Sequence, residues 1–350
     1  MTTLLAGFSM AGASEGGVSR QTLAATLPPD RYYCLLDELP LHLIPQRDRQ
    51  KLNRCHDRSQ PLFLNPACKL CPAGQLPGEL LSQDDLLTRF DLNAFASQGT
   101  IAWVRDATSG NLLPFWLGPA LESVLHDLGP NEPLSPSVPD RARCLLEAAD
   151  ILLPQRQDKL RRREREKEIR KAGALFQRKG YAPFSRWIHP FHIAALRRYY
   201  RYLIRTGKVQ LGDGQSPRRY VAYNEPVARF FHCHIAATLS SIAGEPLKPS
   251  YVYLASYLSG AELKKHTDRE QCEFSVTLCL DFSPEPALET PWPIRLDTPI
   301  ATVAVYQALG DGLAYRGTRL PHYRDVLRGG RTSTSIFFHY VAADFPGSLE

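Results

Sequence analysis

The stretch from residue 266 to residue 280, HTDREQCEFSVTLCL, decides how the second half of this chain is expected to fold. It begins with His266 and Asp268 and continues into residues 273–280, where polar and apolar side chains alternate. Such alternation is typical of a β-strand with one buried face. Residues i and i+2 of an extended segment point to the same side, so His266 and Asp268 can reach one ion from a single strand end.

Three more segments downstream are predicted as strands, which indicates a β-rich C-terminal part. They are residues 302–306, 312–315 and 332–340, with a turn at 309–312 between the first two. His322 lies between the second and the third of these segments. A jelly roll places sequence-distant strands side by side, so it can return His322 to the strand end that carries His266 and Asp268.

These three side chains form a donor set suited to a first-row metal ion. Two imidazoles and one carboxylate cover one face of an octahedral ion and leave the other face open, as in the non-haem Fe(II) oxygenases. Arg331 follows His322 by nine residues and offers a planar guanidinium that can hold a carboxylate through two parallel hydrogen bonds. We therefore expect His266, Asp268 and His322 to be metal ligands.

Residues 251–341 resemble the catalytic core of the Fe(II)/2-oxoglutarate-dependent oxygenases, and most of all their prolyl-hydroxylase-like branch. The residues that carry the resemblance are Tyr257, His266, Asp268, the segment GTRLPH at 317–322, Val326, Gly330, Arg331 and Ser333. The resemblance implies that His266, Asp268 and His322 hold Fe(II). It also implies that Arg331 and Ser333 bind the far carboxylate of 2-oxoglutarate, and that Tyr257 hydrogen-bonds the same cosubstrate.

The resemblance implies a dioxygenase that uses Fe(II), 2-oxoglutarate and O2, with ascorbate as an optional reductant, to hydroxylate a substrate C–H bond. Members of this branch often act on amino-acid side chains, so we expect a peptide, a protein or an amino-acid-derived compound as substrate. Two other functions stay open, namely nucleic-acid base demethylation within the same superfamily and non-catalytic binding on a jelly-roll fold. The complete ligand set speaks against the non-catalytic alternative.

The whole chain is expected to be an α+β protein with two folded parts. Its parts are a flexible tail at 1–25, a small α+β module at 26–154 that is a candidate for substrate recruitment, a charged linker helix at 155–175, and an oxygenase domain at 176–350. The oxygenase domain is expected to be a double-stranded β-helix (jelly roll) with supporting helices at 191–204 and 226–242. The module is expected to contain a hairpin of residues 100–106 and 111–116, followed by helices at 119–128 and 141–152.

Composition and charge limit the partners. The chain is 43% hydrophobic and 22% charged, as in soluble globular proteins, and it lacks an apolar run long enough for a membrane span. Residues 156–171 hold nine Lys or Arg against four Asp or Glu, a pattern that favours an exposed connecting helix over a nucleic-acid-binding surface. We expect a cytoplasmic protein without membrane or nucleic-acid partners, and the oligomeric state stays open. Lys264, Lys265 and Arg269 add positive charge beside the expected site, which either favours an anionic substrate or forms a solvated rim.

The eight cysteines are too sparse for a disulfide scaffold and favour a reduced, intracellular protein. Cys68 and Cys71, with Cys55 and His56 upstream, supply half of a zinc-site pattern. A structural zinc site and a loop with free thiols both stay open here. In the expected helix at 226–242, two further histidines at 232 and 234 face different ways, so we expect one in the core and one at the surface.

Overall fold

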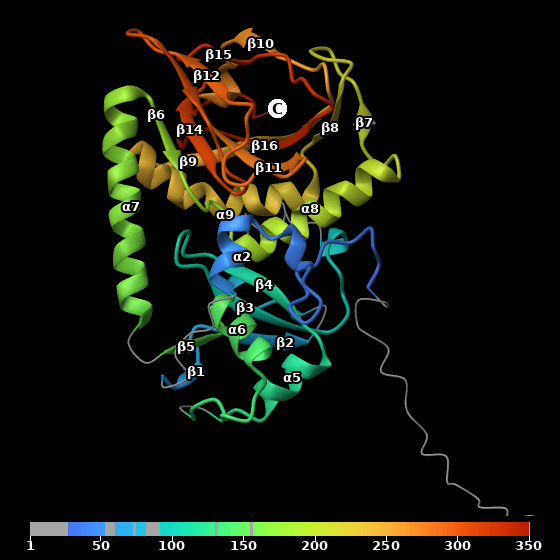
Figure 1. The fold of residues 1–350 in the computed structure, drawn as a ribbon. Helices are drawn as coiled ribbons and strands as arrows, with labels where there is room; N and C mark the ends of the chain where they lie inside the picture. The colour runs from blue at the N-terminus through green and yellow to red at the C-terminus, as the bar shows by residue number, and fades with distance from the viewer. Residues whose placement is uncertain are drawn as a thin grey trace, which may run out of the picture.

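The structure is a computed structural model that describes residues 27–52, 60–72, 75–81, 92–129, 132–154 and 157–349. Within these ranges the chain is a mixed helix-and-sheet protein whose sheets are antiparallel (Figure 1). The expected tail at 1–25 lies outside the described residues. None of the described helices is both long enough and apolar enough to cross a membrane.

The larger sheet of the C-terminal half has seven strands in the order β6-β14-β11-β16-β9-β8-β7. They are β6 (Tyr181–Phe184), β7 (Gln210–Leu211), β8 (Arg219–Tyr223), β9 (Leu247–Tyr257), β11 (Phe274–Ser283), β14 (Gly312–Arg316) and β16 (Thr332–Ala342). In β11 every residue except Ser283 is buried. Its apolar face, with Val276 and Leu278, belongs to the main core, while Ser275 and Thr277 alternate with them on the other face.

The smaller sheet has four strands in the order β10-β15-β12-β13. They are β10 (Leu263–His266), β12 (Ile294–Asp297), β13 (Thr302–Val305) and β15 (His322–Arg324). Figure 1 shows its strands β10, β12 and β15 across from the central strands of the larger sheet. An apolar cluster that includes Ile294 and Leu296 of β12 and Leu313 of β14 joins the two sheets, and a second cluster packs Tyr257 and Phe337 of the larger sheet against Trp292, just before β12.

Long helices cover the larger sheet on the side away from the smaller one (Figure 1). Both α8 (Pro190–Arg205) and α9 (Pro226–Ala243) carry proline in the first turn, where the missing N–H costs no helical hydrogen bond. Gly244 ends α9 in the left-handed conformation, with φ at 77°, which glycine adopts without steric cost.

The charged run forms the start of a longer helix, α7 (Gln157–Lys179). In its last turns Ala172 and Phe176 are buried. A Cβ on Gly173 would lie 3.4 Å from the Ile242 carbonyl oxygen, so α7 and α9 approach closely there. The expected boundary at residue 175 therefore falls inside one helix whose C-terminal part packs against α9.

The N-terminal half contains two small sheets and short helices. Its strands are β1 (Leu62–Leu64), β2 (Lys69–Pro72), β3 (Thr100–Arg105), β4 (Leu112–Leu117) and β5 (Leu152–Pro154), paired as β1-β5 and β2-β3-β4. Its helices are α2 (Gln46–Leu52), α3 (Gly78–Leu81), α5 (Pro119–His126) and α6 (Asp140–Ala148). The hairpin of β3 and β4 matches the sequence expectation, as do α5 and most of α6. The expected helix at 141–152 ends early, at Ala148, and a turn at 149–150 leads toward β5, which begins at Leu152.

One continuous apolar core joins the N-terminal half to helices α8 and α9 and to the larger sheet. Tyr32 is fully buried, and its ring centroid lies 6.1 Å from that of His192 and 5.9 Å from that of Phe231. The ring centroid of Phe115, in β4, lies 4.8 Å from that of His192. The N-terminal half is thus a third layer packed on the helices, and a recruiting role for it stays a prediction.

Most of the expected elements in the C-terminal half are present, including α8, α9, β11, β13, β14 and β16. The expectation for the two α9 histidines was wrong in one respect, because His232 and His234 are both buried. His232 Nε2 bonds the His339 carbonyl at 2.7 Å, and His234 Nε2 lies 2.7 Å from Ser109 Oγ in the β3–β4 turn. Hydrogen bonds to the layers on either side of α9 allow both imidazoles to be buried.

Candidate metal centre

Strand pairing brings His266 and His322 together. β10 runs antiparallel to β15, and His266 lies directly opposite His322 in their register. The register shifts between Leu263 and His266, so β10 is irregular just before the histidine. The two imidazole centroids are 4.4 Å apart.

Backbone carbonyls fix the orientation of both imidazoles. His266 Nδ1 donates to Lys264 O at 2.7 Å, and His322 Nδ1 donates to Leu320 O at 3.0 Å. A carbonyl oxygen can only accept, so each Nδ1 carries the proton and each Nε2 keeps a lone pair available to a metal ion.

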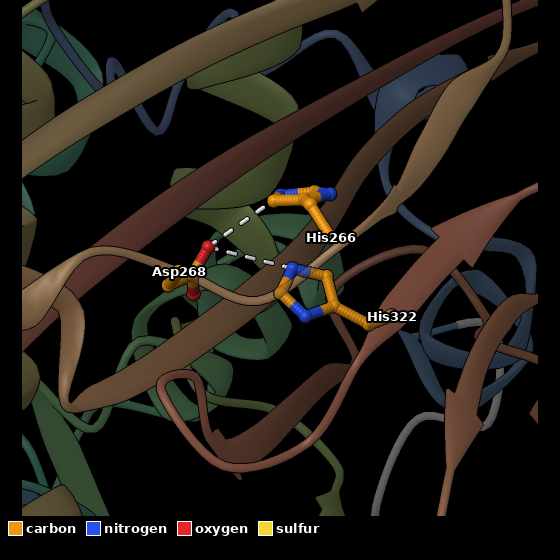
Figure 2. Close-up of side chains that lie close together, drawn as sticks. All are labelled: His266, Asp268 and His322. Atoms are coloured by element: carbon orange, nitrogen blue, oxygen red, sulfur yellow. Dashed lines mark ion pairs between the residues drawn. The ribbon is translucent and has the colours of Figure 1, made fainter.

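Asp268 completes the donor set from the loop after β10. Its Oδ1 lies 3.6 Å from His266 Nε2 and 3.5 Å from His322 Nε2, as the dashed lines of Figure 2 mark. Ligand atoms of the three residues all lie within 4.8 Å of one another, close enough for a single ion to contact all three. Burial raises the pKa of Asp268, but the two imidazoles beside its carboxylate outweigh burial and hold that pKa well below its usual range. The carboxylate is therefore ionised at neutral pH and faces two imidazole nitrogens.

The three residues line a cavity of about 570 Å³. Its wall is largely aromatic, with Tyr223, Tyr251, Tyr253, Tyr257, Tyr315 and Phe337. Tyr223 is 45% exposed and therefore lies at the open side of the cavity, and its ring centroid is 5.2 Å from that of the buried Tyr251. Arg269 stacks at 4.5 Å on the Tyr251 ring and donates to the Tyr251 hydroxyl at 3.2 Å. The cavity therefore combines the ligand set with aromatic surface and a cation.

The positive charge expected beside the site is only partly there. Arg269 lines the cavity, whereas Lys264 and Lys265 are not among the described residues that do. Lys265 instead forms an ion pair with Asp297 at 2.7 Å.

The three residues expected to bind the cosubstrate are placed differently from one another. Tyr257 is fully buried, lines the cavity and lies opposite Ser333 in the register of β9 and β16. Ser333 is buried as well. Arg331 is half-buried in the turn before β16, directly after Gly330, and is not among the described residues that line the cavity.

Two arginines that the sequence did not single out lie near the ligand set. Arg219 of β8 lines the cavity, donates to Tyr257 Oη at 3.1 Å and forms an ion pair with Asp213 at 2.5 Å. Arg324 of β15 is 3% exposed and stacks at 4.8 Å on Trp292. The sequence could have indicated Arg324 through its position two residues after His322, because such residues share a face of a strand. That spacing is informative only once β15 is known to be a strand.

The cysteine pattern is only partly described. Cys55 and His56 lie outside the described residues. Burial raises the pKa of Cys68 to about 12, so its thiol is protonated at neutral pH. Within the described ranges, the groups of three or more ligand-type side chains are the triad and a set of Asp268, Cys272 and His339, and neither contains Cys68 or Cys71. The zinc alternative stays a prediction.

No family model matches the sequence, and no curated protein matches it. Several solved structures match about half of the chain. The non-heme alpha ketoglutarate dependent epimerase SnoN from nogalamycin biosynthesis is 16% identical over 51% of this chain and 90% of its own, with a TM-score of 0.43. A Pseudomonas putida prolyl-4-hydroxylase is 15% identical over 50% of this chain and 98% of its own, with a TM-score of 0.41. A 2OG-Fe(II) oxygenase family oxidoreductase from Burkholderia pseudomallei is 12% identical over 52% of this chain and 92% of its own, also at 0.41. Such distant likenesses assign no role to any residue.

Proposed function

We propose that this protein is an Fe(II)- and 2-oxoglutarate-dependent dioxygenase that hydroxylates a C–H bond of a peptide, a protein or an amino-acid-derived compound. The observation that carries the proposal is the convergence of His266, Asp268 and His322 on the wall of a cavity of about 570 Å³. Two imidazoles and one carboxylate leave the remaining positions of an octahedral ion for other ligands. The two antiparallel sheets, with helices outside the larger one, support a double-stranded β-helix as the architecture.

The chemistry of the three side chains fits Fe(II). Imidazole and carboxylate suit this ion, and structural zinc sites usually contain thiolates. Both Nε2 atoms are available because both Nδ1 atoms are bonded to carbonyls, and the carboxylate is ionised. Bound there with 2-oxoglutarate and O2, iron would supply the oxidising power for hydroxylation, coupled to release of CO2 and succinate.

The far carboxylate of 2-oxoglutarate requires a cation, and we propose Arg324 for this role, with Arg331 as the alternative. Arg324 donates to Trp292 O at 2.7 Å and to Gln307 Oε1 at 3.2 Å, and neither acceptor is charged. In the described part of the chain its Nε has no hydrogen-bond partner and no carboxylate pairs with it. A buried guanidinium without an anion is energetically costly, which supports a bound carboxylate as its partner.

Two further observations connect Arg324 with the site. Arg324 and His322 are two residues apart in β15, so their side chains lie on the same face of the strand. Burial lowers the pKa of Arg324, while Tyr257 and Tyr315, which both line the cavity, are near enough to raise it. Arg324 therefore lies just behind the cavity wall beside the ligand set, whereas Arg331 lies in a turn outside that wall.

The aromatic wall suits the substrate side of the reaction. Tyr251, Tyr253 and Phe337 can enclose an aliphatic or aromatic group and keep water away from the C–H bond that reacts. Arg269 has no carboxylate among its described contacts and can bind an anionic group of the substrate at the open side. These features support an amino-acid-derived substrate, since such compounds combine an apolar side chain with a carboxylate or backbone polar groups.

The two other functions gain no support from a specific observation. A base demethylase needs cations at the site that can contact phosphates, but of the two described arginines that line the cavity Arg219 is already paired with Asp213. A non-catalytic binding role would leave the complete ligand set without a purpose.

Turnover of 2-oxoglutarate tests the proposal directly. The purified chain, loaded with Fe(II) under argon and then given O2, is expected to form succinate faster than Asp268→Ala does. Peptide and amino-acid libraries screened by mass spectrometry should contain a compound that gains one oxygen atom and accelerates succinate formation. Equal rates in the wild type and Asp268→Ala, or no succinate from the iron-loaded wild type, would overturn the proposal.

A further inference from the structure

The two oxygens of the Asp268 carboxylate have different partners. Oδ1 faces the two histidines, at 3.6 Å from His266 Nε2 and 3.5 Å from His322 Nε2. Oδ2 accepts a hydrogen bond from Ser275 Oγ at 3.0 Å. Ser275 belongs to β11 and is 1% exposed, so water does not compete for this bond. One oxygen is thus turned toward the ion-binding point and the other toward the larger sheet.

A second residue sets the direction of the serine proton. Ser275 lies directly opposite His339 in the register of β11 and β16, with 2.9 Å between Ser275 Oγ and His339 Nδ1. The hydroxyl has two acceptors, Asp268 Oδ2 at 3.0 Å and the Cys272 carbonyl at 3.4 Å, and the nearer, charged oxygen takes the proton. In either case the hydroxyl proton is used, so His339 Nδ1 must donate to the serine oxygen. A neutral imidazole with its proton on Nδ1 and a protonated imidazole can both make this donation. The chain of donors therefore runs from His339 through Ser275 to Asp268.

Gly317 also contacts Asp268 and restricts the space around its carboxylate. Its carbonyl accepts from the Asp268 N–H at 3.0 Å, and its own N–H donates to Glu273 O at 3.0 Å, just before β11. A Cβ on Gly317 would overlap Asp268 Oδ2 and the Cys272 carbonyl oxygen. The backbone of Gly317 is not left-handed, so the lack of space, and not the conformation, requires glycine here.

From these contacts we infer that Ser275, His339 and Gly317 are positioning residues that present Asp268 to the ion through Oδ1 alone. The inference rests on the proposed metal site and adds how its only acidic ligand is oriented. A carboxylate can bind an ion through one oxygen or through both. If Oδ2 also bound, it would occupy a position that a cosubstrate needs. The bond to Ser275 therefore keeps the open face of the ion available.

Cys272 offers a competing use of the same cluster. Its sulfur lies with the ligand atoms of Asp268 and His339 within 4.8 Å, as in a second cation site. However, the Cys272 sulfur already has a partner, because it lies 2.8 Å from Tyr251 Oη. Asp268 and His339 are also already joined through Ser275. We therefore assign no cation to this second group, and cobalt spectroscopy can detect one, because a thiolate bound to Co(II) adds an intense near-ultraviolet absorption.

The experiment is an anaerobic Co(II) titration of the metal-free full chain, followed by visible absorption, for Ser275→Ala and matched variants. Ser335→Ala is the control, because Ser335 is a fully buried serine on β16 whose Oγ has no partner in the described part of the chain. We expect Ser275→Ala to bind Co(II) about ten- to hundredfold more weakly than Ser335→Ala, as is typical for loss of a ligand's hydrogen-bond partner. Ser275→Thr, which keeps the hydroxyl, should restore most of the affinity, and the visible spectrum should change in Ser275→Ala alone.

The outcomes separate this inference from the proposed function. If the wild type binds no Co(II), the metal site itself is refuted. If the wild type and Ser275→Ala bind Co(II) with the same affinity and the same spectrum, Ser275 has only a structural role and the inference is overturned. A cobalt–thiolate band in the spectrum of the wild type would also overturn it. Should Ser275→Ala fail to fold, His339→Phe takes its place, because loss of the Nδ1 donor should also weaken Co(II) binding. His339→Gln is its control, because glutamine retains a donor, and this variant should bind Co(II) more tightly than His339→Phe. Equal affinities for those two variants and the wild type would overturn the inference as well.

Discussion

His322 of β15 lies directly opposite His266 of β10, so two expected ligands of one ion are also partners in a pair of strands. The pairing sets the 4.4 Å between their rings, and the carbonyls of Lys264 and Leu320 set the rotation of each ring. Side chains placed by strands are held more precisely than side chains placed by loops. Asp268 comes from a loop and depends on contacts of its own, so the three ligands should differ in their sensitivity to nearby substitutions.

Asp268→Ala should abolish iron binding and turnover while the protein stays folded. The substitution removes one of three ligands and the negative charge of the site. It should not unfold the protein, because burial of the charged carboxylate itself costs free energy on folding. Iron content after anaerobic loading, succinate formation and the circular dichroism spectrum measure the three effects. Full activity of Asp268→Ala with iron supplied would show that Asp268 is not a ligand.

Arg324→Met and Arg331→Ala should separate the two candidates for the carboxylate of 2-oxoglutarate. A hydrogen bond to a charged group contributes roughly 1.5–3 kcal/mol, so Arg324→Met should weaken 2-oxoglutarate binding by at least about tenfold. Replacement of a buried charge by an apolar side chain of similar size often leaves stability unchanged or improved, so the variant should fold. Calorimetric titration of the Ni(II)-loaded protein measures the affinity. The reverse pattern, with loss only in Arg331→Ala, would assign the carboxylate to Arg331.

Phe115→Ala should destabilise the whole chain and not the N-terminal half alone. Phe115 is 1% exposed and packs on His189 and His192 of the α8 region, in the core shared with the sheet. Removal of a buried phenylalanine costs about 3–5 kcal/mol. A single cooperative thermal transition at lower temperature is expected, with little change in Leu160→Ala, whose side chain is 58% exposed. Two separate transitions, with only one of them shifted, would show that the halves fold independently and would favour the recruiting role.

His192→Gln should flatten the dependence of stability on pH between about 5 and 6.5. Burial, followed by the neighbouring His189, holds the pKa of His192 well below the value of 6.5. Below pH 6.5 the imidazole of His192 therefore binds a proton in the unfolded chain but not in the folded chain. The contribution of His192 to the free energy of unfolding is fully present above pH 6.5 and decreases as the pH falls below that value. Urea midpoints across this range measure the effect. The same slope in wild type and His192→Gln would contradict it.

The sequence was informative wherever a local pattern carried the information. Helices α8 and α9 have apolar residues at helical spacing, and β11 and β16 alternate, so these elements could be predicted. The polar face of β11 was expected to meet solvent, yet Ser275 and Thr277 are both buried. Alternation identifies the two faces of a strand but not what covers each face. The role of Ser275 therefore became visible only with the smaller sheet and its loops in place.

Other features depend on contacts between segments far apart in the chain. Arg324 lies on a strand of three residues, too short to show alternation, so its position on the same face as His322 had no local signal. Apolar residues such as Trp116 predict a core but not its partner, and the packing of the N-terminal half on α8 and α9 could not be inferred. Arg331 was identified by its distance of nine residues from His322 along the chain. That count contains no information about the turn at residues 329–330, after which the Arg331 side chain is not among the described residues that line the cavity.

Anomalous diffraction from crystals grown or soaked with Fe(II) under argon tests the central claim most directly. Data collected at the iron edge should show one strong peak per chain, within bonding distance of His266 Nε2, His322 Nε2 and Asp268 Oδ1, with Asp268 Oδ2 still on Ser275. No peak at this point, or a peak held by other residues while the three side chains point apart, would contradict the account.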